Sequence, residues 1–337
     1  MTNTQPILET LFQGRDLSYD TAYHAFGSLL SGHEDPLWIS ALLMGLQTKG
    51  QTVTELTAAC AAMQEAMTPL PQQVDAMDIV GTGGDGQHTL NVSTATAFVV
   101  AGCGVTVAKH GNRAASSLSG ASDVLSALGI NIKASHQDIQ QSLEQHNIAF
   151  LWAPLFHPGM QYVAPVRAAL KIPTIFNFLG PLCNPAGVRR MLLGVAKQEM
   201  VRPMVEALHN RGALSVWGVY GADGLDELSI TGENHVTMLK DNTITEFTSH
   251  PEEIGLPTAP LEAIRGGTPK ENAHAMKELF AGEKSAYRDM VVYNAAASLV
   301  IAGHAEDLAT GAEQAKESLD SGAAKTCLEG LIGQNYV

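Results

Sequence analysis

The sequence lacks an excess of basic residues. Its 337 residues include 20 lysines and arginines against 34 aspartates and glutamates, which gives a formal net charge of −14. Because proteins bind a nucleic-acid backbone through positive charge, this balance argues against a nucleic-acid partner. The four cysteines, Cys60, Cys103, Cys183 and Cys327, lack metal-ligand spacing and lie among apolar or small residues. We therefore expect free buried thiols rather than disulfides or zinc ligands.

Long hydrophobic runs are also missing. No stretch approaches the length that spans a membrane, and residues 1–7 lack the charged-then-apolar pattern of a signal peptide. We expect a cytoplasmic protein with no membrane contact. The chain has no Gly-x-Ser-x-Gly elbow, no evident cysteine–histidine partnership and no isolated carboxylate pair. We therefore expect neither a covalent nucleophile nor a general base among its residues.

The first seventy residues have the pattern of helices. Helix starts are predicted at Asp16 or Ser18, at Asp35 followed by proline, and at the Thr52-to-Glu55 capping box. Prolines at positions 69 and 71 then break the chain. A length of 337 residues with 45% hydrophobic residues supports two domains. We expect a small all-helical domain over residues 1–72.

Beyond residue 72, strand and helix patterns alternate, which is typical of an α/β domain with a mainly parallel central sheet. We assign residues 73–337 to this domain. Strands are predicted at residues 77–80, 105–108, 149–153, 191–195 and 214–220, with a β-hairpin at 235–240 and 243–248. Helices are predicted at residues 137–146, 200–210, 271–281 and 286–302.

Anion-binding chemistry follows two consecutive strands. The first strand is followed by Gly81-Thr82-Gly83-Gly84-Asp85. Ser93 or Thr94 is then expected to cap the apolar helix at 95–103. The second delivers Lys109-His110-Gly111-Asn112-Arg113. Taken singly, a glycine cluster is usually a turn, the cations are solvated charges, and the serines at 116–119 are a loop before a cap. Together, at the carboxyl ends of neighbouring strands, they predict two phosphate subsites.

Two further clusters have weaker signals. Asp226-Glu227 follows the strand at 214–220, and beside a pyrophosphate site these carboxylates suit Mg²⁺, with Asp85 and Ser93 as further oxygen donors. Alone, the pair fits an acid-rich loop. His157 and Arg167 are predicted to share one helix face, although Arg167 alone fits a surface charge. Residues 177–185 are predicted to form a rigid loop.

The segments at 81–85, 91–94, 109–117, 150–165, 177–185 and 226–227 together resemble the anthranilate phosphoribosyltransferase family. The resemblance implies the nucleoside-phosphorylase-like, type III phosphoribosyltransferase architecture, in which a helical segment near residues 160–190 completes the helical domain. It also implies that anthranilate and 5-phosphoribosyl 1-pyrophosphate (PRPP) give N-(5-phosphoribosyl)anthranilate and pyrophosphate, with two Mg²⁺ ions. The family is homodimeric, and an anthranilate synthase component is a possible partner. Apolar residues at 8–12 and 26–46 fit a dimer surface or an ordinary helical core equally well.

The resemblance also implies roles for individual residues. PRPP binding would involve Gly81, Gly84, Asp85, Thr89, Asn91, Val92, Ser93, Thr94, Lys109, His110, Gly111, Asn112, Arg113, Ala114, Ala115, Ser116 and Ser117. Anthranilate binding would involve Gly81, Asn112 and Arg167, with His110, His157 and Pro181 lining the access channel. The metal ligands would be Ser93, Asp226 and Glu227.

Three positions depart from the family pattern. Leu118 stands where a basic residue is common, Ala121 where a serine is frequent, and Val92 where isoleucine is usual. A charged contact at 118 and a hydroxyl contact at 121 are therefore not expected. Two rival functions stay open at this stage: a pyrimidine nucleoside phosphorylase of the same plan, and a non-catalytic or nucleic-acid-binding relative.

Overall fold

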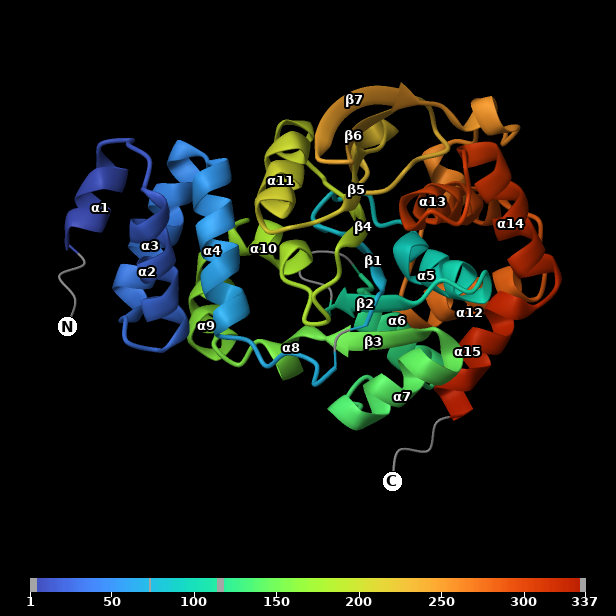
Figure 1. Cartoon of the computed structure of the whole chain (residues 1–337), viewed down its shortest axis with the longest axis horizontal. Helices are drawn as coiled ribbons and strands as arrows, with labels where there is room; N and C mark the ends of the chain where they lie inside the picture. The colour runs from blue at the N-terminus through green and yellow to red at the C-terminus, as the bar shows by residue number, and fades with distance from the viewer. Residues whose placement is uncertain (1–4, 73, 114–117, 334–337) are drawn as a thin grey trace.

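The computed structural model describes residues 5–72, 74–113 and 118–333, and its amino-terminal part is a group of helices at one end of the molecule (Figure 1). These helices are α1 (Gln5–Phe12), α2 (Tyr19–Leu30), α3 (Pro36–Lys49) and α4 (Val53–Glu65). The predicted caps are confirmed at Ser18, which accepts a hydrogen bond from the Thr21 amide, and at Asp35, which accepts from two amides of α3. The reciprocal capping box between Thr52 and Glu55 is also present.

Two later helices pack on this amino-terminal group. They are α9 (Met160–Leu170) and α10 (Phe176–Leu182). The rings of Phe26 on α2 and Phe176 on α10 meet edge to face with centroids 5.9 Å apart. The same apolar cluster continues into α11 (Gln198–Asn210) and β4 (Arg190–Gly194), so the helices share a core with one face of the sheet. This packing is compatible with the predicted domain limits, which stay a prediction.

A seven-stranded sheet forms the centre of the rest of the chain (Figure 1), in the order β3-β2-β1-β4-β5-β6-β7. Strands β1 to β5 are parallel, whereas β6 and β7 form an antiparallel hairpin. The hairpin turns through Asp241 and Asn242 with φ values of 50° and 59°, a conformation that these residue types tolerate. The other strands are β1 (Met77–Gly81), β2 (Val107–Gly111), β3 (Ile148–Trp152), β5 (Ser215–Tyr220), β6 (Asn234–Lys240) and β7 (Thr243–Ser249).

The opposite face of the sheet is covered by α5 (Val92–Gly102) and α13 (Ala286–Ala302), whose apolar residues belong to a second large core. The remaining helices are α6 (Ala121–Leu128), α7 (His136–His146), α8 (Ala153–Phe156), α12 (Pro269–Phe280), α14 (Leu308–Asp320) and α15 (Ala323–Gly333). Short 3₁₀ turns lie at Ala222–Gly224, Pro251–Ile254 and Leu261–Ile264. The predicted fold class, a helical part joined to an α/β part with a mainly parallel sheet, is confirmed.

Several local predictions were wrong. Strand β2 extends to Gly111, so Lys109 lies within the strand rather than after it. Helix α5 begins at Val92 and is capped by neither Ser93 nor Thr94, because its amino end finds its acceptor elsewhere, as described below. Residues 177–185 are mostly helical rather than a loop, since α10 runs to Leu182.

The helix face predicted to carry both His157 and Arg167 does not exist either. His157 ends α8 in a non-helical conformation, and Arg167 lies on α9. Within the described residues, all four cysteines are free thiols, three of them buried and Cys103 half-buried. None of the helices in the described ranges is both long and apolar enough to cross a membrane.

Candidate functional site

A pocket of about 740 Å³ opens at the carboxyl ends of β1 and β2, between the sheet and helices α9 and α10. Most of the predicted site residues line it, although they come from separate parts of the chain. They are Gly81, Gly84, Ser93, Lys109, His110, Gly111, Asn112, Arg113, His157, Arg167, Pro181, Asp226 and Glu227. The structure therefore brings the glycine loop, the basic strand end, the acidic pair and Arg167 to one place.

Other predicted residues lie beside the pocket rather than on its wall. Asp85 Oδ1 accepts a hydrogen bond from the Gln87 amide within the glycine loop. Thr89 pairs with Arg265 in an isolated bridge. Val92 and Thr94 are buried in the first turn of α5. Asn91 is discussed below, and Ala114, Ala115, Ser116 and Ser117 lie outside the described residues.

The acidic pair is held against the glycine loop and the start of α5. The Gly83 amide donates to Asp226 Oδ2 at 2.7 Å, and the Ser93 amide donates to Glu227 Oε1 at 3.1 Å. This second bond supplies the acceptor that the amino end of α5 lacks locally. The backbone approaches closely here, because a Cβ on Gly194 would lie 1.6 Å from the carbonyl oxygen of Asp226. Glycine is required at that position.

Burial raises the pKa of both carboxyl groups. The pKa of Asp226 is raised to about 7, with the nearby charge of Asp85 as the second cause, and the Gly83 amide opposes the rise. The pKa of Glu227 is raised to about 8 by burial and by the charge of Asp226, although Lys109 opposes it. The negative charge of these two buried carboxylates is only partly balanced by nearby groups. A cation that bridges them to a ligand would balance it.

Lys109 is buried at the centre of this charged group. Its Nζ donates to the carbonyl oxygen of Ile79 at 2.6 Å and to Ser93 Oγ at 3.3 Å. Burial lowers the pKa of Lys109, whereas the carboxylates of Asp78, Glu227 and Asp226 act in the opposite direction. The ammonium group therefore lies at the start of α5, close to the acidic pair.

Two neutral imidazoles form another wall of the pocket. The rings of His110 and His157 lie 5.2 Å apart, and His110 Nδ1 donates to the Gly180 carbonyl at 3.1 Å. Burial lowers the pKa of His110 to about 3 and that of His157 to about 4. With neutral rings, this wall is suited to a flat, weakly polar group rather than to a phosphate.

Arg167 has a different environment from the other cations. Its Nη2 donates to Asn177 Oδ1 at 3.2 Å, and its guanidinium carbon lies 5.7 Å from the centre of the Phe176 ring. Burial lowers its pKa, and within the described ranges Arg167 forms no ion pair. A half-buried guanidinium that faces a cavity without a carboxylate partner is suited to a ligand carboxylate.

Asn91 is fixed by several neighbours just outside the pocket. Its Oδ1 accepts from Asn272 Nδ2 at 2.9 Å, and its Nδ2 donates to the Ser119 carbonyl at 3.2 Å. Its own carbonyl accepts from the Tyr287 hydroxyl at 3.1 Å. Asn91 thus connects the start of α5 with Ser119 and with helices α12 and α13.

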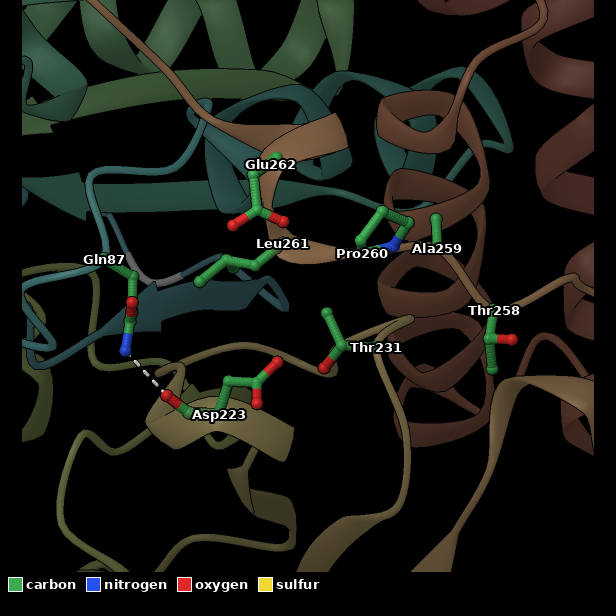
Figure 2. Close-up of a pocket in the computed structure, with 8 residues that line it drawn as sticks. All are labelled: Gln87, Asp223, Thr231, Thr258, Ala259, Pro260, Leu261 and Glu262. Atoms are coloured by element: carbon green, nitrogen blue, oxygen red, sulfur yellow. Dashed lines mark hydrogen bonds between the residues drawn. The ribbon is translucent and has the colours of Figure 1, made fainter.

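A second hollow of about 670 Å³ is lined by Gln87, which follows the glycine loop, and by residues 258–262 (Figure 2). Gln87 Nε2 donates to the Asp223 carbonyl at 2.7 Å across one side of it, which joins the glycine loop to the loop that carries the acidic pair. Among the described residues, its wall includes the carboxylates of Asp223 and Glu262 and no lysine or arginine. This charge does not suit a phosphorylated ligand, so the hollow is not a second candidate site.

Sequence reasoning missed some residues of the site. Gln161 and Phe176 line the pocket, and Asn177 orients Arg167. Their helical positions do not distinguish them from ordinary core or surface residues. Asp78 and Asn184 were also missed. An aspartate in the middle of an otherwise apolar strand was the available signal for Asp78.

Comparisons with known proteins agree with this arrangement. Residues 5–67 match the helical bundle domain of a glycosyl transferase family, and residues 73–325 match its a/b domain. The chain therefore belongs to that class of transferases.

Individual relatives define the family more narrowly. Anthranilate phosphoribosyltransferase from Parvibaculum lavamentivorans is 49% identical over 100% of both chains, and that from Rhodopseudomonas palustris is 47% identical over 98% of both. The crystal structure of the Thermus thermophilus enzyme covers 96% of this chain and 98% of its own, with a TM-score of 0.90 and 42% identity. The Saccharomyces cerevisiae enzyme in complex with PRPP and Mg covers 96% of this chain and 95% of its own, with a TM-score of 0.88 and 30% identity. The chain belongs to the anthranilate phosphoribosyltransferase family.

Proposed function

We propose that the pocket carries out the reaction for which the family is named, the transfer of the 5-phosphoribosyl group from PRPP to the amine of anthranilate with release of pyrophosphate. The observation that carries this proposal is the placement of Arg167. An uncompensated guanidinium shares one pocket with a phosphate-type loop and an acidic pair. An aromatic carboxylic acid and a phosphorylated donor would satisfy both parts.

The donor would lie at the carboxyl ends of β1 and β2. The glycine loop from Gly81 to Asp85 offers backbone amides, and Lys109 and Arg113 offer positive charge. Asn112 and the buried amino end of α5 would complete the contacts to the ribose and its phosphate. The residues that we propose for PRPP binding are those predicted from the sequence, with Asn91 acting in part through its fixed position.

The acidic pair fits a bound magnesium ion. Asp226 and Glu227 are adjacent buried carboxylates whose pKa values are raised by burial and by neighbouring negative charge. Mg²⁺ takes one or two protein carboxylates and completes its shell with water and phosphate oxygens, which the adjacent pair beside a phosphate-type loop would allow. Asp226, Glu227 and Ser93 would hold the metal, which when bound would supply positive charge next to the pyrophosphate group. We propose two such ions.

The chain's own residues would position the reactants and stabilise charge. The C1–O bond to pyrophosphate breaks and a C1–N bond to the amine forms, with the electron pair leaving on pyrophosphate and the amine proton passing to solvent or to that anion. Backbone amides of the glycine loop and Lys109 would stabilise the leaving group. Arg167 would hold the anthranilate carboxylate, and the neutral rings of His110 and His157, with Pro181, would flank the aromatic ring. No side chain needs to form a covalent bond.

We further propose that the protein is a homodimer through its helical part. Phe12 on α1 and Leu37 on α3 are 92% and 83% exposed, and Met44 on α3 is 38% exposed. Large apolar side chains exposed to this degree on neighbouring helices are typical of an interaction surface. An anthranilate synthase component as partner and a cytoplasmic location stay predictions from the sequence.

The proposal is tested by incubating the protein with PRPP, Mg²⁺ and anthranilate and following the fluorescence of anthranilate. Loss of fluorescence that needs all three components is expected. A parallel reaction with uridine and inorganic phosphate tests the pyrimidine phosphorylase alternative. Turnover in that reaction, with anthranilate unchanged in the first, would overturn the proposal.

A further inference from the structure

We infer that Asp78 and Asn184 are positioning residues that hold β1 and β2 apart and thereby place Lys109 for the phosphorylated donor. This inference rests on the proposed function. It assigns a role to two fully buried polar side chains that lie behind the pocket wall rather than on it.

The two strands separate as they approach the site. Residue pairing between β1 and β2 is confined to Met77 with Val107. On its other side, β1 pairs with β4 along its whole length, from Met77 with Arg190 to Gly81 with Gly194. The space between the carboxyl halves of β1 and β2 therefore holds side chains instead of backbone hydrogen bonds.

Asp78 and Asn184 occupy that space. Asp78 Oδ1 accepts from the amides of Ile79 and His110, at 2.8 Å and 3.2 Å. Asn184 Nδ2 donates to Asp78 Oδ2 at 2.7 Å and to the carbonyl of Ala108 at 2.8 Å. The side chains thus satisfy backbone groups on both strands that ordinary strand pairing would otherwise use.

The separation leaves the carbonyl of Ile79 free to accept from Lys109 Nζ. This contact directs the lysine side chain, which starts on β2, across to β1 and toward Ser93 at the start of α5. If the strands paired normally, the Ile79 carbonyl would accept from a β2 amide, and Lys109 would lose the acceptor that fixes it. The position of the ammonium group therefore depends on the separation between β1 and β2.

The chemistry of the arrangement supports a functional role. A fully buried carboxylate is costly unless it is well compensated, and a continuous strand ladder would satisfy the same amides and carbonyls without burying a charge. Asn184 also follows α10, the helix that carries Pro181 of the pocket. The cost of the buried charge therefore favours a role in placing Lys109 rather than a purely structural one.

The test is Asp78→Asn, which keeps the volume but sets an amide donor against Asn184 Nδ2. Because one charge-assisted hydrogen-bond network is disturbed, we expect the KM for PRPP to rise about tenfold or more, with the KM for anthranilate changed less than about threefold. Calorimetric titration with Mg²⁺ and inorganic pyrophosphate should show the same weakening without any turnover. Asn184→Ala, which removes a neutral side chain, should give the same split.

Ser142→Ala is the matched control, because it removes one buried hydrogen bond to a strand carbonyl, that of Ile148 at 2.6 Å, outside the pocket. It should lower the melting temperature and leave both KM values unchanged. The inference is overturned if the two variants behave like the control, if both KM values rise together, or if neither variant folds while the control does. Wild-type protein that binds Mg²⁺ and pyrophosphate but leaves anthranilate unchanged would contradict the proposed function alone.

Discussion

Among the described residues, the hydrogen bonds of Arg167, Asp226 and Glu227 go to neutral groups: an asparagine side chain and two backbone amides. Arg167 faces the cavity with an asparagine as its hydrogen-bond acceptor, and burial raises the pKa values of Asp226 and Glu227. Charges held in this way are costly in the free protein and favourable once a ligand of opposite charge binds. The charges of these residues therefore indicate the charges of the ligands: a carboxylate is expected near Arg167 and a cation near the acidic pair.

Replacing Arg167 by alanine should raise the KM for anthranilate by about 10- to 100-fold, because a charge-assisted hydrogen bond to its carboxylate is lost. The KM for PRPP should change little. Steady-state kinetics with each substrate varied in turn measures the split. Arg202→Ala is the control, since this exposed arginine on α11 pairs with Glu206 and Glu246 outside the pocket. Equal effects on both substrates would remove Arg167 as the carboxylate contact.

His157 should affect the acid sensitivity of the fold. Its folded pKa of about 4 is below the ordinary value of 6.5, so the unfolded chain binds the proton more tightly between these values. Stability is therefore lost as the pH falls from about 6.5 to 4, by up to about 3 kcal/mol from this group. His157→Asn should remove that part of the loss. Urea unfolding at pH 7 and pH 4.5 measures it, and an equal fall in both proteins would contradict the assignment.

At the scale of elements, the site is built where strand ends lie unusually close to the loop that carries the acidic pair. Gly81 at the end of β1 and Gly194 at the end of β4 both border Asp226 with no room for a Cβ. The acidic pair thus depends on two glycines that come from separate strands.

Gly194→Ala should displace the loop that carries Asp226, because the new Cβ would fall on its carbonyl oxygen. We expect affinity for pyrophosphate in the presence of Mg²⁺ to fall by more than about tenfold, as calorimetric titration measures. Gly27→Ala on α2 is the control, since open space surrounds that position and alanine favours a helix by about 0.5–1 kcal/mol. Unchanged pyrophosphate affinity in Gly194→Ala would show that the close approach does not matter.

Helix starts could be predicted where the capping residue is local in the sequence. The prediction was wrong where the cap comes from a distant residue. Ser18, Asp35 and Thr52 each bond amides within a few residues, so the sequence alone shows them. The amide of Ser93 instead bonds Glu227, 134 residues away in the chain, and no local pattern reveals that partner. Strand β2 likewise continues through Lys109 because its backbone pairs with β3 as far as Gly111 with Trp152, a partner strand that no local pattern reveals.

At the scale of the whole molecule, the pocket joins segments that the chain order keeps far apart. Alternating strands and helices predicted a parallel sheet, and the carboxyl ends of its strands were the expected place for a ligand. The meeting of Arg167 with the glycine loop was expected from the family resemblance, not from any spacing in the sequence. The placement of Asp78 and Asn184 between β1 and β2 was not predictable, because it depends on a contact between residues 106 positions apart.

The proposed dimer makes a prediction at this scale. Replacing both Phe12 and Leu37 by glutamate should convert the protein to a monomer, because charged side chains would then occupy an apolar interface. Sedimentation equilibrium measures the change. Leu214→Glu is the control, since Leu214 is 42% exposed and lies just before β5, apart from helices α1 and α3. A wild-type protein that is monomeric, or a double variant that stays dimeric, would contradict the proposed interface.

The most direct test of the central claim is the stoichiometry of the reaction. The purified protein is mixed with PRPP, Mg²⁺ and anthranilate, and the loss of anthranilate and the release of pyrophosphate are measured in the same sample. One pyrophosphate should appear for each anthranilate consumed, and chelation of Mg²⁺ should stop both changes. Pyrophosphate release without loss of anthranilate, or no change in either, would contradict it.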